Sequence, residues 1–298
     1  MSQSNYIDFP CPVCSSANYT PVYLDTLNGR YPQFGYGFTP EHSKTYRIVR
    51  CNECGHAYSS PRPADLYAHY RDVVDADYLK DQGQRRRTAE KVIQRMKKYQ
   101  PSGRLMDVGC STADFLSVAK EHYTVEGLEL SAWASDIARS RGFIVHNCTL
   151  EEFRARDDYD IVTLWGVVEH LEAPKRAISS VHRMLKNGGL VCLWTGNMDS
   201  ITSTLLGKKW WWILGQHIQY FSERSLETLL TECGFERLYM GTYPYVMSMG
   251  SISKSLNRYP VLGEIAKKIL NLPDIVNRQM TISLPGEMFA IYRKIPIS

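Results

Sequence analysis

The segment "LMDVGCSTADFL", residues 105–116, decides how the middle of the chain is expected to fold. Apolar residues flank Asp107, small residues fill positions 109–113, and Phe115 and Leu116 begin a second apolar pattern. This order is typical of a buried strand that ends in a tight turn ahead of a helix. In α/β folds such a turn binds nucleotides, because free backbone N–H groups and the positive end of the helix face the ligand.

Strand and helix patterns alternate from Pro101 onward. Short apolar segments that predict further strands are "YTVEGLEL" (123–130), "FIVHNC" (143–148), "YDIVTLWGVV" (159–168) and "GGLVCLWTG" (188–196). Helical patterns separate them, for example "SAWASDIARSRG" at 131–142. Strands that alternate with helices predict an α/β fold, a Rossmann-like, doubly wound parallel sheet with helices on both faces. Ligands of such sheets bind at the C-terminal ends of the strands, where the turn at 109–113 lies.

The turn and the next strand narrow the choice of ligand. A dinucleotide fingerprint needs three spaced glycines, but Gly109 is the only glycine of the turn, and the Gly-Lys-Ser/Thr of a phosphate-binding loop is missing. Glu129 ends the next strand, about 20 residues past the turn, where a carboxylate can accept hydrogen bonds from both ribose hydroxyls. A ribose without a pyrophosphate indicates a nucleoside-like cofactor, and S-adenosylmethionine fits this description.

Two Cys-x-x-Cys pairs lie near the N-terminus, Cys11 with Cys14 and Cys51 with Cys54. Two such pairs complete the tetrahedral shell that zinc prefers, and four thiolates with no open position make a structural site. The long excursion between the pairs contains "YPQFGYGF" (31–38), for which we expect a long hairpin rich in aromatic residues. A disulfide pair or a redox motif is the competing interpretation.

Four segments together resemble the class I S-adenosylmethionine-dependent methyltransferases. "DVGCSTADFL" is similar to the turn of that family, "GLELS" to its acidic second-strand motif, "YDIVTLWGVVEHL" to its fourth-strand segment and "LKNGGLVCLWTGN" to its Gly-Gly turn and fifth strand. The resemblance covers residues 101–240 and implies a mostly parallel, seven-stranded sheet with an antiparallel final strand. The cysteine pairs with "SPRP" (60–63) further resemble bacterial methyltransferases of polysaccharide and natural-product gene clusters.

The resemblance also implies which residues contact S-adenosylmethionine. Asp107 would orient the turn and the methionine amine, and Glu129 would hold the ribose; a turn-capping carboxylate and a surface acid are the plain alternatives. The other residues implied are Gly109 and Cys110 at the methionine part, Thr149 and Leu150 at the adenine, Trp165 and Gly166 facing the cofactor, and Ser111, Phe115 and Leu130 beside them. Ser111 and Ala113 stand where the family often has glycine, which constrains the turn and bears on cofactor affinity.

A hydroxyl acceptor needs a base within hydrogen-bond reach, and histidine suits that role near neutral pH. The candidates are His170 in "VVEHL" and His217 in "GQHIQYFS", with Tyr220 as an assistant. The family commonly has a histidine at the position of His170, so a structural or cofactor-side role is its alternative. The tryptophans at 210–212 predict a lid or an acceptor wall, or else a packing contact with the next helix.

The patterns predict a succession of units along the chain. These are a small zinc-ribbon domain (1–62), a helical linker (63–100), the cofactor-binding methyltransferase core (101–243), a helical insertion (244–284) and the final core strand (285–298). The insertion contains "VLGEIAKKILNL" (261–272), whose apolar residues recur at helical spacing. It could cover the acceptor pocket, pack against a second copy in a homodimer, or do both.

Composition limits the partners. The chain has 298 residues and a net charge of +4, too small to indicate nucleic acid or an anionic membrane surface by itself. No apolar run has the length of a spanning helix, and the first residues lack a signal-peptide pattern, so we expect a cytoplasmic protein. The favoured function is methyl transfer to a small molecule (a sugar nucleotide, a glycan unit or a natural product), with O-methylation ahead of C- or N-methylation. The alternatives are an RNA methyltransferase that binds RNA through its zinc ribbon and a non-catalytic scaffold protein on the same fold.

Overall fold

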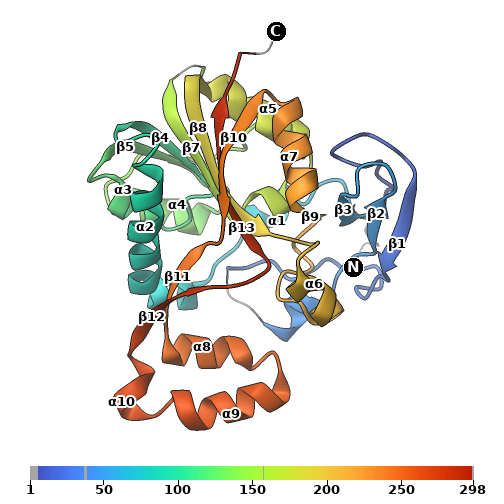
Figure 1. Ribbon diagram of the computed structural model, residues 1–298, viewed down its shortest axis with the longest axis vertical. Helices are drawn as coiled ribbons and strands as arrows, with labels where there is room; N and C mark the ends of the chain where they lie inside the picture. Colours follow the sequence, from blue (N-terminus) through green and yellow to red (C-terminus); the bar gives the residue numbers. More distant parts are fainter. Residues whose placement is uncertain (1–5, 37–38, 157, 297–298) are drawn as a thin grey trace.

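The computed structural model describes residues 6–36, 39–156 and 158–296, and its largest sheet has seven strands in the order β10-β13-β8-β7-β4-β5-β6. Strands β4 to β8 run parallel, and β13 pairs antiparallel with both β8 and β10 (Figure 1). The predicted doubly wound sheet with an antiparallel final strand is therefore confirmed. The strands are β4 (Gly103–Val108), β5 (Tyr123–Leu128), β6 (Val145–His146), β7 (Tyr159–Trp165), β8 (Leu185–Gly196), β10 (Phe235–Gly241) and β13 (Glu287–Lys294).

Helices cover both faces of this sheet, because successive residues of each central strand point to opposite faces. In β4, Leu105 packs into the apolar cluster that holds residues of α2, α3 and α4, whereas Met106 packs into the cluster that holds α5 and α7. Both side chains are fully buried. The helices are α2 (Gln82–Met96), α3 (Asp114–Ala119), α4 (Ala132–Ser140), α5 (Pro174–Met184) and α7 (Glu223–Glu232).

A second, antiparallel sheet of four strands, in the order β1-β2-β3-β9, stands beside the main sheet (Figure 1). Three of its strands come from the predicted zinc ribbon, but β9 comes from the segment that follows the fifth core strand. The register pairs Tyr58 of β3 with Gln219 of β9. The ribbon is thus joined to the core by a shared sheet. The strands are β1 (Tyr19–Tyr23), β2 (Ile48–Cys51), β3 (Ala57–Ser59) and β9 (Gln219–Tyr220).

The excursion between the cysteine pairs contains the antiparallel pair β1–β2, as the predicted hairpin requires, but the aromatic run at 31–38 falls in the segment between these strands. The described part of residues 24–47 contains no strand, and its helical element is η1 (Pro40–Ser43); Gly37 and Phe38 lie outside the described residues. The loop crosses to the core, where the backbone N–H of Gly35 donates to Gln216 Oε1 and Gln216 Nε2 donates back to the Gly35 carbonyl, both at 3.1 Å. These contacts replace the strand pairing that the aromatic pattern suggested.

The predicted linker contains α1 (Tyr67–Arg71), the 3₁₀ segment η2 (Ala76–Asp81) and α2. Helix α2 buries Val92 and Met96 completely, so it forms part of the helical layer on the main sheet. Among the described residues, no helix is long and apolar enough to cross a membrane.

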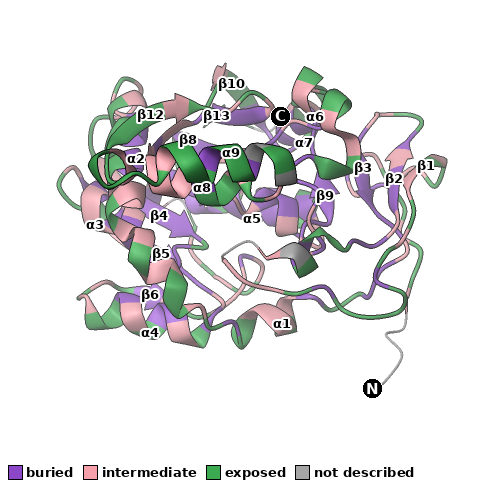
Figure 2. Ribbon diagram, turned by 90° about the horizontal axis from the view of Figure 1, so that it is seen from below, coloured by how far each residue is buried: buried purple, intermediate pink, exposed green. Residues whose placement is uncertain are grey.

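The region predicted as an insertion extends away from the main sheet (Figure 1). Strands β11 and β12 form a two-stranded ribbon that carries three helices at its end. Helix α9 leaves Val261 and Ile269 exposed by 75% and 54%, so one apolar face of the helix contacts solvent (Figure 2). The elements are β11 (Pro244–Ser248), α8 (Met249–Leu256), α9 (Pro260–Leu270), α10 (Pro273–Val276) and β12 (Gln279–Ser283).

Candidate active site

The four N-terminal cysteines converge in the small domain. Their sulfur atoms all lie within 4.8 Å of one another, with 3.5 Å between Cys11 and Cys54 and 3.5 Å between Cys14 and Cys51. Ligands about 2.3 Å from a tetrahedral zinc ion would bring sulfur atoms to about 3.8 Å from each other. Burial raises the pKa of the Cys11 thiol, so a cation is needed to keep it a thiolate. The donor set fits a structural zinc with a closed shell.

His56, beside the second cysteine pair, connects the small sheet to the core. Its Nε2 lies 3.0 Å from Gln219 Oε1 and its Nδ1 lies 3.3 Å from Ser225 Oγ. Burial lowers the pKa of His56 to about 4, so the ring is neutral at physiological pH. The side chain is fully buried and spans from β3 to β9 and α7.

The turn after β4 has a left-handed backbone. Gly109, Ser111 and Ala113 have φ angles of 69°, 46° and 66°. This conformation costs a non-glycine residue roughly 1–2 kcal/mol, so Ser111 and Ala113 are held in it by their surroundings. The backbone N–H groups of Gly109 and Cys110 contribute, because both donate to the Leu128 carbonyl, at 2.8 and 3.0 Å. The turn keeps the shape that glycines would give it.

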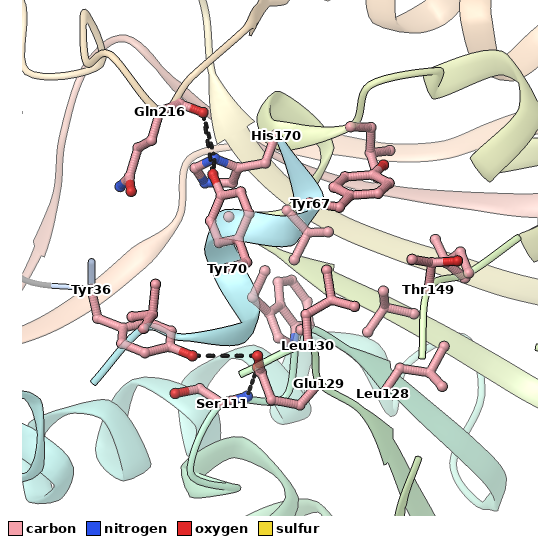
Figure 3. A pocket seen from close by; sticks show the side chains of 18 of the residues that line it. Tyr36, Tyr67, Tyr70, Ser111, Leu128, Glu129, Leu130, Thr149, His170 and Gln216 are labelled. Atoms are coloured by element: carbon pink, nitrogen blue, oxygen red, sulfur yellow. Dashed lines mark hydrogen bonds between the residues drawn. The ribbon is translucent and has the colours of Figure 1, made fainter. Parts of the chain in front are cut away.

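Glu129 follows β5 and faces this turn. Its Oε2 accepts a hydrogen bond from the Ser111 N–H at 2.8 Å, and its Oε1 accepts one from the Ser131 N–H at 2.8 Å and one from the Tyr36 hydroxyl at 3.3 Å (Figure 3). The side chain is 7% exposed; burial raises its pKa, and the bonds from the two serine amides oppose that rise. Glu129 is therefore a buried acceptor and not a surface acid.

Asp107 lies on β4 beneath the turn. The Thr163 hydroxyl on β7 donates to Asp107 Oδ1 at 2.6 Å. Burial raises the pKa of Asp107 to about 7, although the bond from Thr163 lowers it. The amides of the turn bond to Leu128 and Glu129 instead, so Asp107 does not act as the cap of the turn.

Every residue predicted at the cofactor lines one cleft at the C-terminal ends of β4, β5 and β7. One part of the cleft is lined by Gly109, Ser111, Glu129, Leu130, Thr149, Leu150, Trp165 and Gly166; the adjoining part shares Gly109, Ser111, Trp165 and Gly166 and adds Asp107, Cys110 and Phe115. Trp165 Nε1 is buried there with no hydrogen-bond partner among the described residues, so it is a donor available to a ligand.

Tyrosines from the N-terminal third cover the cleft, and the sequence did not reveal them as site residues. Tyr36, Tyr67, Tyr70 and Tyr78 all line its first part (Figure 3). The rings of Tyr36 and Tyr78 lie 4.7 Å apart, so the loop between β1 and β2 packs on the segment before α2. The aromatic run at 31–38 was the available signal, but its partner across the cleft could not be read from it.

The second part of the cleft widens into an aromatic chamber, which is lined by Trp194, Trp211, Trp212, Tyr243, Tyr245 and Glu287. Glu287 is buried and accepts hydrogen bonds from the indole N–H groups of Trp194 at 2.8 Å and Trp211 at 2.7 Å. Burial raises the pKa of Glu287. Of the three tryptophans, Trp211 and Trp212 line this chamber, whereas Trp210 lines neither part of the cleft and packs with Trp212 in an apolar cluster under the small sheet.

Glu169, His170 and His217 meet where the aromatic chamber joins the cofactor side of the cleft. Glu169 and His170 belong to the 3₁₀ segment η3 (Val168–His170), and His217 precedes β9. The two imidazole rings are 4.7 Å apart between centroids. Burial lowers the pKa of His170 to about 4 and that of His217 well below its usual value, and it raises the pKa of Glu169 to about 8.

Tyr220 does not reach the cleft, so the structure does not support its predicted role as assistant. Its hydroxyl donates to the Leu214 carbonyl at 3.1 Å, and its buried ring packs with Ile48 and Trp210. Because β9 is paired with β3, the side chain of Tyr220 is held against the small sheet.

The chain belongs to the methyltransferase domain family, whose model matches residues 82–239, more than half of the chain. The matched region contains the turn, Glu129 and both histidines. The domain is therefore that of a class I S-adenosylmethionine-dependent methyltransferase.

Relatives and solved structures agree with this class. The chain is 32% identical over 116 residues to a ubiquinone biosynthesis O-methyltransferase of Klebsiella pneumoniae, which covers 36% of this chain and 45% of that enzyme. It is 29% identical over 137 residues to "Probable tRNA methyltransferase 9B" of Bos taurus, which covers 44% of this chain and 30% of that protein. The chain thus spans less than half the length of these two relatives. An S-adenosylmethionine-dependent methyltransferase of Archaeoglobus fulgidus has the same fold, with a TM-score of 0.51 at 19% identity over 74% of this chain and all of that one.

Proposed function

We propose that this protein transfers a methyl group from S-adenosylmethionine to a small-molecule acceptor, with a hydroxyl oxygen as the favoured acceptor atom. The observation that carries the proposal is the aromatic chamber, which adjoins the cofactor side of the cleft and has His170, His217 and Glu169 at its mouth. Aromatic walls with a few buried polar groups suit a compact organic molecule. A sugar nucleotide, a glycan unit or a natural product fits this description.

The cleft offers suitable partners for the cofactor. Glu129 accepts two amide bonds and one bond from the Tyr36 hydroxyl, which leaves about one of its four lone-pair positions for a ribose hydroxyl, and a second if the Tyr36 hydroxyl turns away. The left-handed turn and Asp107 lie where the methionine part would bind, and Thr149 and Leu150 lie where the adenine would bind. Trp165, whose Nε1 is a buried donor without a partner among the described residues, lines the same space. Tyr36 would close over the ribose from the N-terminal loop.

Catalysis would combine alignment with proton removal. When bound, S-adenosylmethionine supplies a methyl group on a sulfonium, and the acceptor oxygen displaces the sulfur in line. The aromatic chamber holds the acceptor and keeps water away from the reacting atoms. The hydroxyl proton would pass to the Nε2 lone pair of His217 or His170; their lowered pKa values keep the rings neutral with this lone pair open, and also make both imidazoles weaker bases than a free histidine.

An RNA acceptor is the second candidate, because the bovine relative is named as a tRNA methyltransferase. A net charge of +4 offers little attraction to phosphates. The small four-stranded sheet is also joined to the core by the pairing of β3 with β9. His170 and His217 line the chamber, and His217 is buried there. These features favour a small acceptor.

Calorimetric titration of the zinc-loaded protein with S-adenosylmethionine tests the proposal, with Glu129→Ala as the paired variant. We expect binding by the wild type and its loss in the variant. Mass spectrometry of a panel of sugar, glycan, phenolic and RNA acceptors should then show a methyl gain of the small acceptors alone. If neither S-adenosylmethionine nor its demethylated product binds, with or without acceptors, a scaffold role replaces the proposed enzyme; methylation of RNA alone would favour the second candidate.

A further inference from the structure

Glu169, His170 and His217 present one potential ligand atom each toward a common point. These three atoms all lie within 4.8 Å of one another. Glu169 and His217 are 2% and 6% exposed, and all three residues line the aromatic chamber. The group lies in the cleft, apart from the four cysteines, which form a separate cluster in the small domain.

The backbone fixes which nitrogen of each imidazole is free. His170 Nδ1 lies 2.9 Å from the Gln216 carbonyl, and His217 Nδ1 lies 2.8 Å from the Trp212 carbonyl. A carbonyl oxygen can only accept a hydrogen bond, so each Nδ1 carries the hydrogen. Each Nε2 therefore keeps its lone pair. A ring N–H bonded to a backbone carbonyl is the usual support of a metal-binding histidine, because it fixes the tautomer and the orientation of the ring.

The Tyr70 hydroxyl adds to the support of His170. It lies 2.7 Å from His170 Nδ1 and donates to the Gln216 carbonyl at 3.3 Å (Figure 3). The ring of His170 is thereby held between the segment of α1 and the loop before β9.

Glu169 has one oxygen engaged and one oxygen available. Its Oε2 accepts a hydrogen bond from the Thr195 hydroxyl at 3.0 Å, while its Oε1 lies 4.0 Å from His170 Nε2. That separation is too long for a hydrogen bond; an ion about 2.1 Å from both atoms in tetrahedral geometry would bring them to about 3.4 Å from each other, a closure of about 0.6 Å. No described lysine or arginine forms an ion pair with Glu169, and the charged group that acts on it is another carboxylate, Glu287. A buried carboxylate without a cationic partner holds a proton instead of its charge, and a bound cation would take the place of that proton.

We propose that Glu169 Oε1, His170 Nε2 and His217 Nε2 bind a divalent transition-metal ion at the mouth of the aromatic chamber. Two imidazoles and one carboxylate are a ligand set of Mn²⁺, Fe²⁺, Co²⁺ and Zn²⁺, and three protein ligands leave positions for acceptor oxygens. The site deepens the proposed function and rests on it for its role, which is to hold the acceptor oxygen in its deprotonated form, its proton being released to water as the acceptor binds. The ion and a proton cannot share one Nε2 lone pair, so binding of the ion replaces direct proton transfer to the imidazoles.

The test is a Mn²⁺ titration of the full-length, zinc-loaded protein, followed by electron paramagnetic resonance. Mn²⁺ suits nitrogen and oxygen ligands and competes poorly for thiolates, so zinc stays on the cysteines. We expect one Mn²⁺ ion per chain. His217→Gln and Glu169→Gln should each weaken Mn²⁺ binding by about a hundredfold or more. His122→Gln, which changes a histidine outside the cleft, should leave it unchanged.

Zinc content and S-adenosylmethionine binding show whether the variants are folded. The inference is overturned if the wild type binds no Mn²⁺, Co²⁺ or second Zn²⁺, or if both cleft variants bind Mn²⁺ as the wild type does. In that case S-adenosylmethionine binding and methyl transfer could still be observed, with an imidazole taking the proton directly. Loss of cofactor binding by a protein that still binds Mn²⁺ would instead contradict the proposed function and leave the metal site standing.

Discussion

The two halves of the cleft are built in different ways. The cofactor half consists of strand ends and the turns that follow them, with Asp107, the left-handed turn and Glu129 all between residues 105 and 131. The acceptor half is assembled from distant segments: the end of β8, the tryptophans before β9, the residues at the start of β11, and the start of β13, whereas the segment around α1 lines the cofactor half alone. One half follows from local sequence, and the other depends on how remote segments pack. The halves should therefore respond differently to substitution.

Removal of one of the four clustered cysteines should give the largest difference between the halves. Cys51→Ser removes one of four ligands, and we expect the loss of zinc and a drop in the free energy of unfolding on the order of 5 kcal/mol. Because β9 and the loop after β1 depend on the small sheet, methyl transfer should fall further than S-adenosylmethionine affinity. Zinc analysis, denaturant unfolding and calorimetry measure these effects. Cys233→Ser, outside the cluster, is the control, and a Cys51 variant that retains zinc and full activity would contradict the expectation.

The pH dependence of stability tests whether Asp107, in the cofactor half, is a buried carboxyl group with a raised pKa. Burial raises the pKa of Asp107 from 3.8 to about 7, so the folded protein binds this proton more tightly than the unfolded chain does. The stabilisation is complete below pH 4 and is lost as the pH rises toward 7. In Asp107→Asn this decline should be absent, a difference of up to about 4 kcal/mol across the window. Urea unfolding of wild type and variant at several pH values measures it, with the surface variant Asp136→Asn as control; parallel curves would contradict the buried, protonated carboxyl.

Substitutions of Glu129 and Tyr36 compare how much a strand-end residue and a residue of the remote N-terminal loop contribute to the affinity for S-adenosylmethionine. Glu129→Gln should raise the Kd for S-adenosylmethionine by about thirtyfold, because a charged acceptor bond is worth about 2 kcal/mol. Tyr36→Phe removes one hydroxyl at 3.3 Å from Glu129 and should raise the Kd only severalfold. Calorimetry of both variants measures this order. If Tyr36→Phe is the more damaging change, the N-terminal loop holds the cofactor more tightly than the strand end does.

The smallest effect is expected at Tyr220. Tyr220→Phe loses the hydrogen bond to the Leu214 carbonyl, which should cost about 1 kcal/mol of stability and leave the rate of methyl transfer unchanged. Tyr70→Phe is the matched change at a tyrosine that lines the cleft, because the Tyr70 hydroxyl contacts His170 directly. We expect that variant to slow methyl transfer. Steady-state kinetics of the two variants distinguishes the roles of the two tyrosines. If Tyr220→Phe slowed methyl transfer, the result would support the predicted role of Tyr220 as an assistant to the base.

The sequence predicted those parts of the fold that local patterns encode. Alternation of apolar strands and helices reflects burial in the main sheet, and the carboxylate of Glu129 falls at a strand end whichever helices cover it. Helix α2 was taken as part of a linker because its many arginines hide the buried stripe that includes Val92 and Met96. A hairpin was predicted between the cysteine pairs from the length of that excursion, and its two strands are β1 and β2, but the aromatic residues lie in the loop between them because their partners are far away in the sequence.

The acceptor side was predicted less completely. His170 and His217 were identified by residue type, and the structure brings their rings together. Glu169 and Glu287 escaped notice because a single glutamate carries no local sign that it will be buried. Tyr220 was assigned to the cleft because it is near His217 in sequence, but the pairing of β9 with β3 carries its side chain to the small sheet.

The shared strand β9 also limits how the protein can be taken apart. A ribbon cut at residue 62 would leave Gln219 without its pairing to Tyr58 and without His56, and the edge of β3 would be open to other chains. A chimera that exchanges the ribbon with a relative must therefore carry the segment from Gln216 to Phe221 along with it. The small domain and the segment that bears His217 therefore form one structural unit, although more than 150 residues separate them in the sequence.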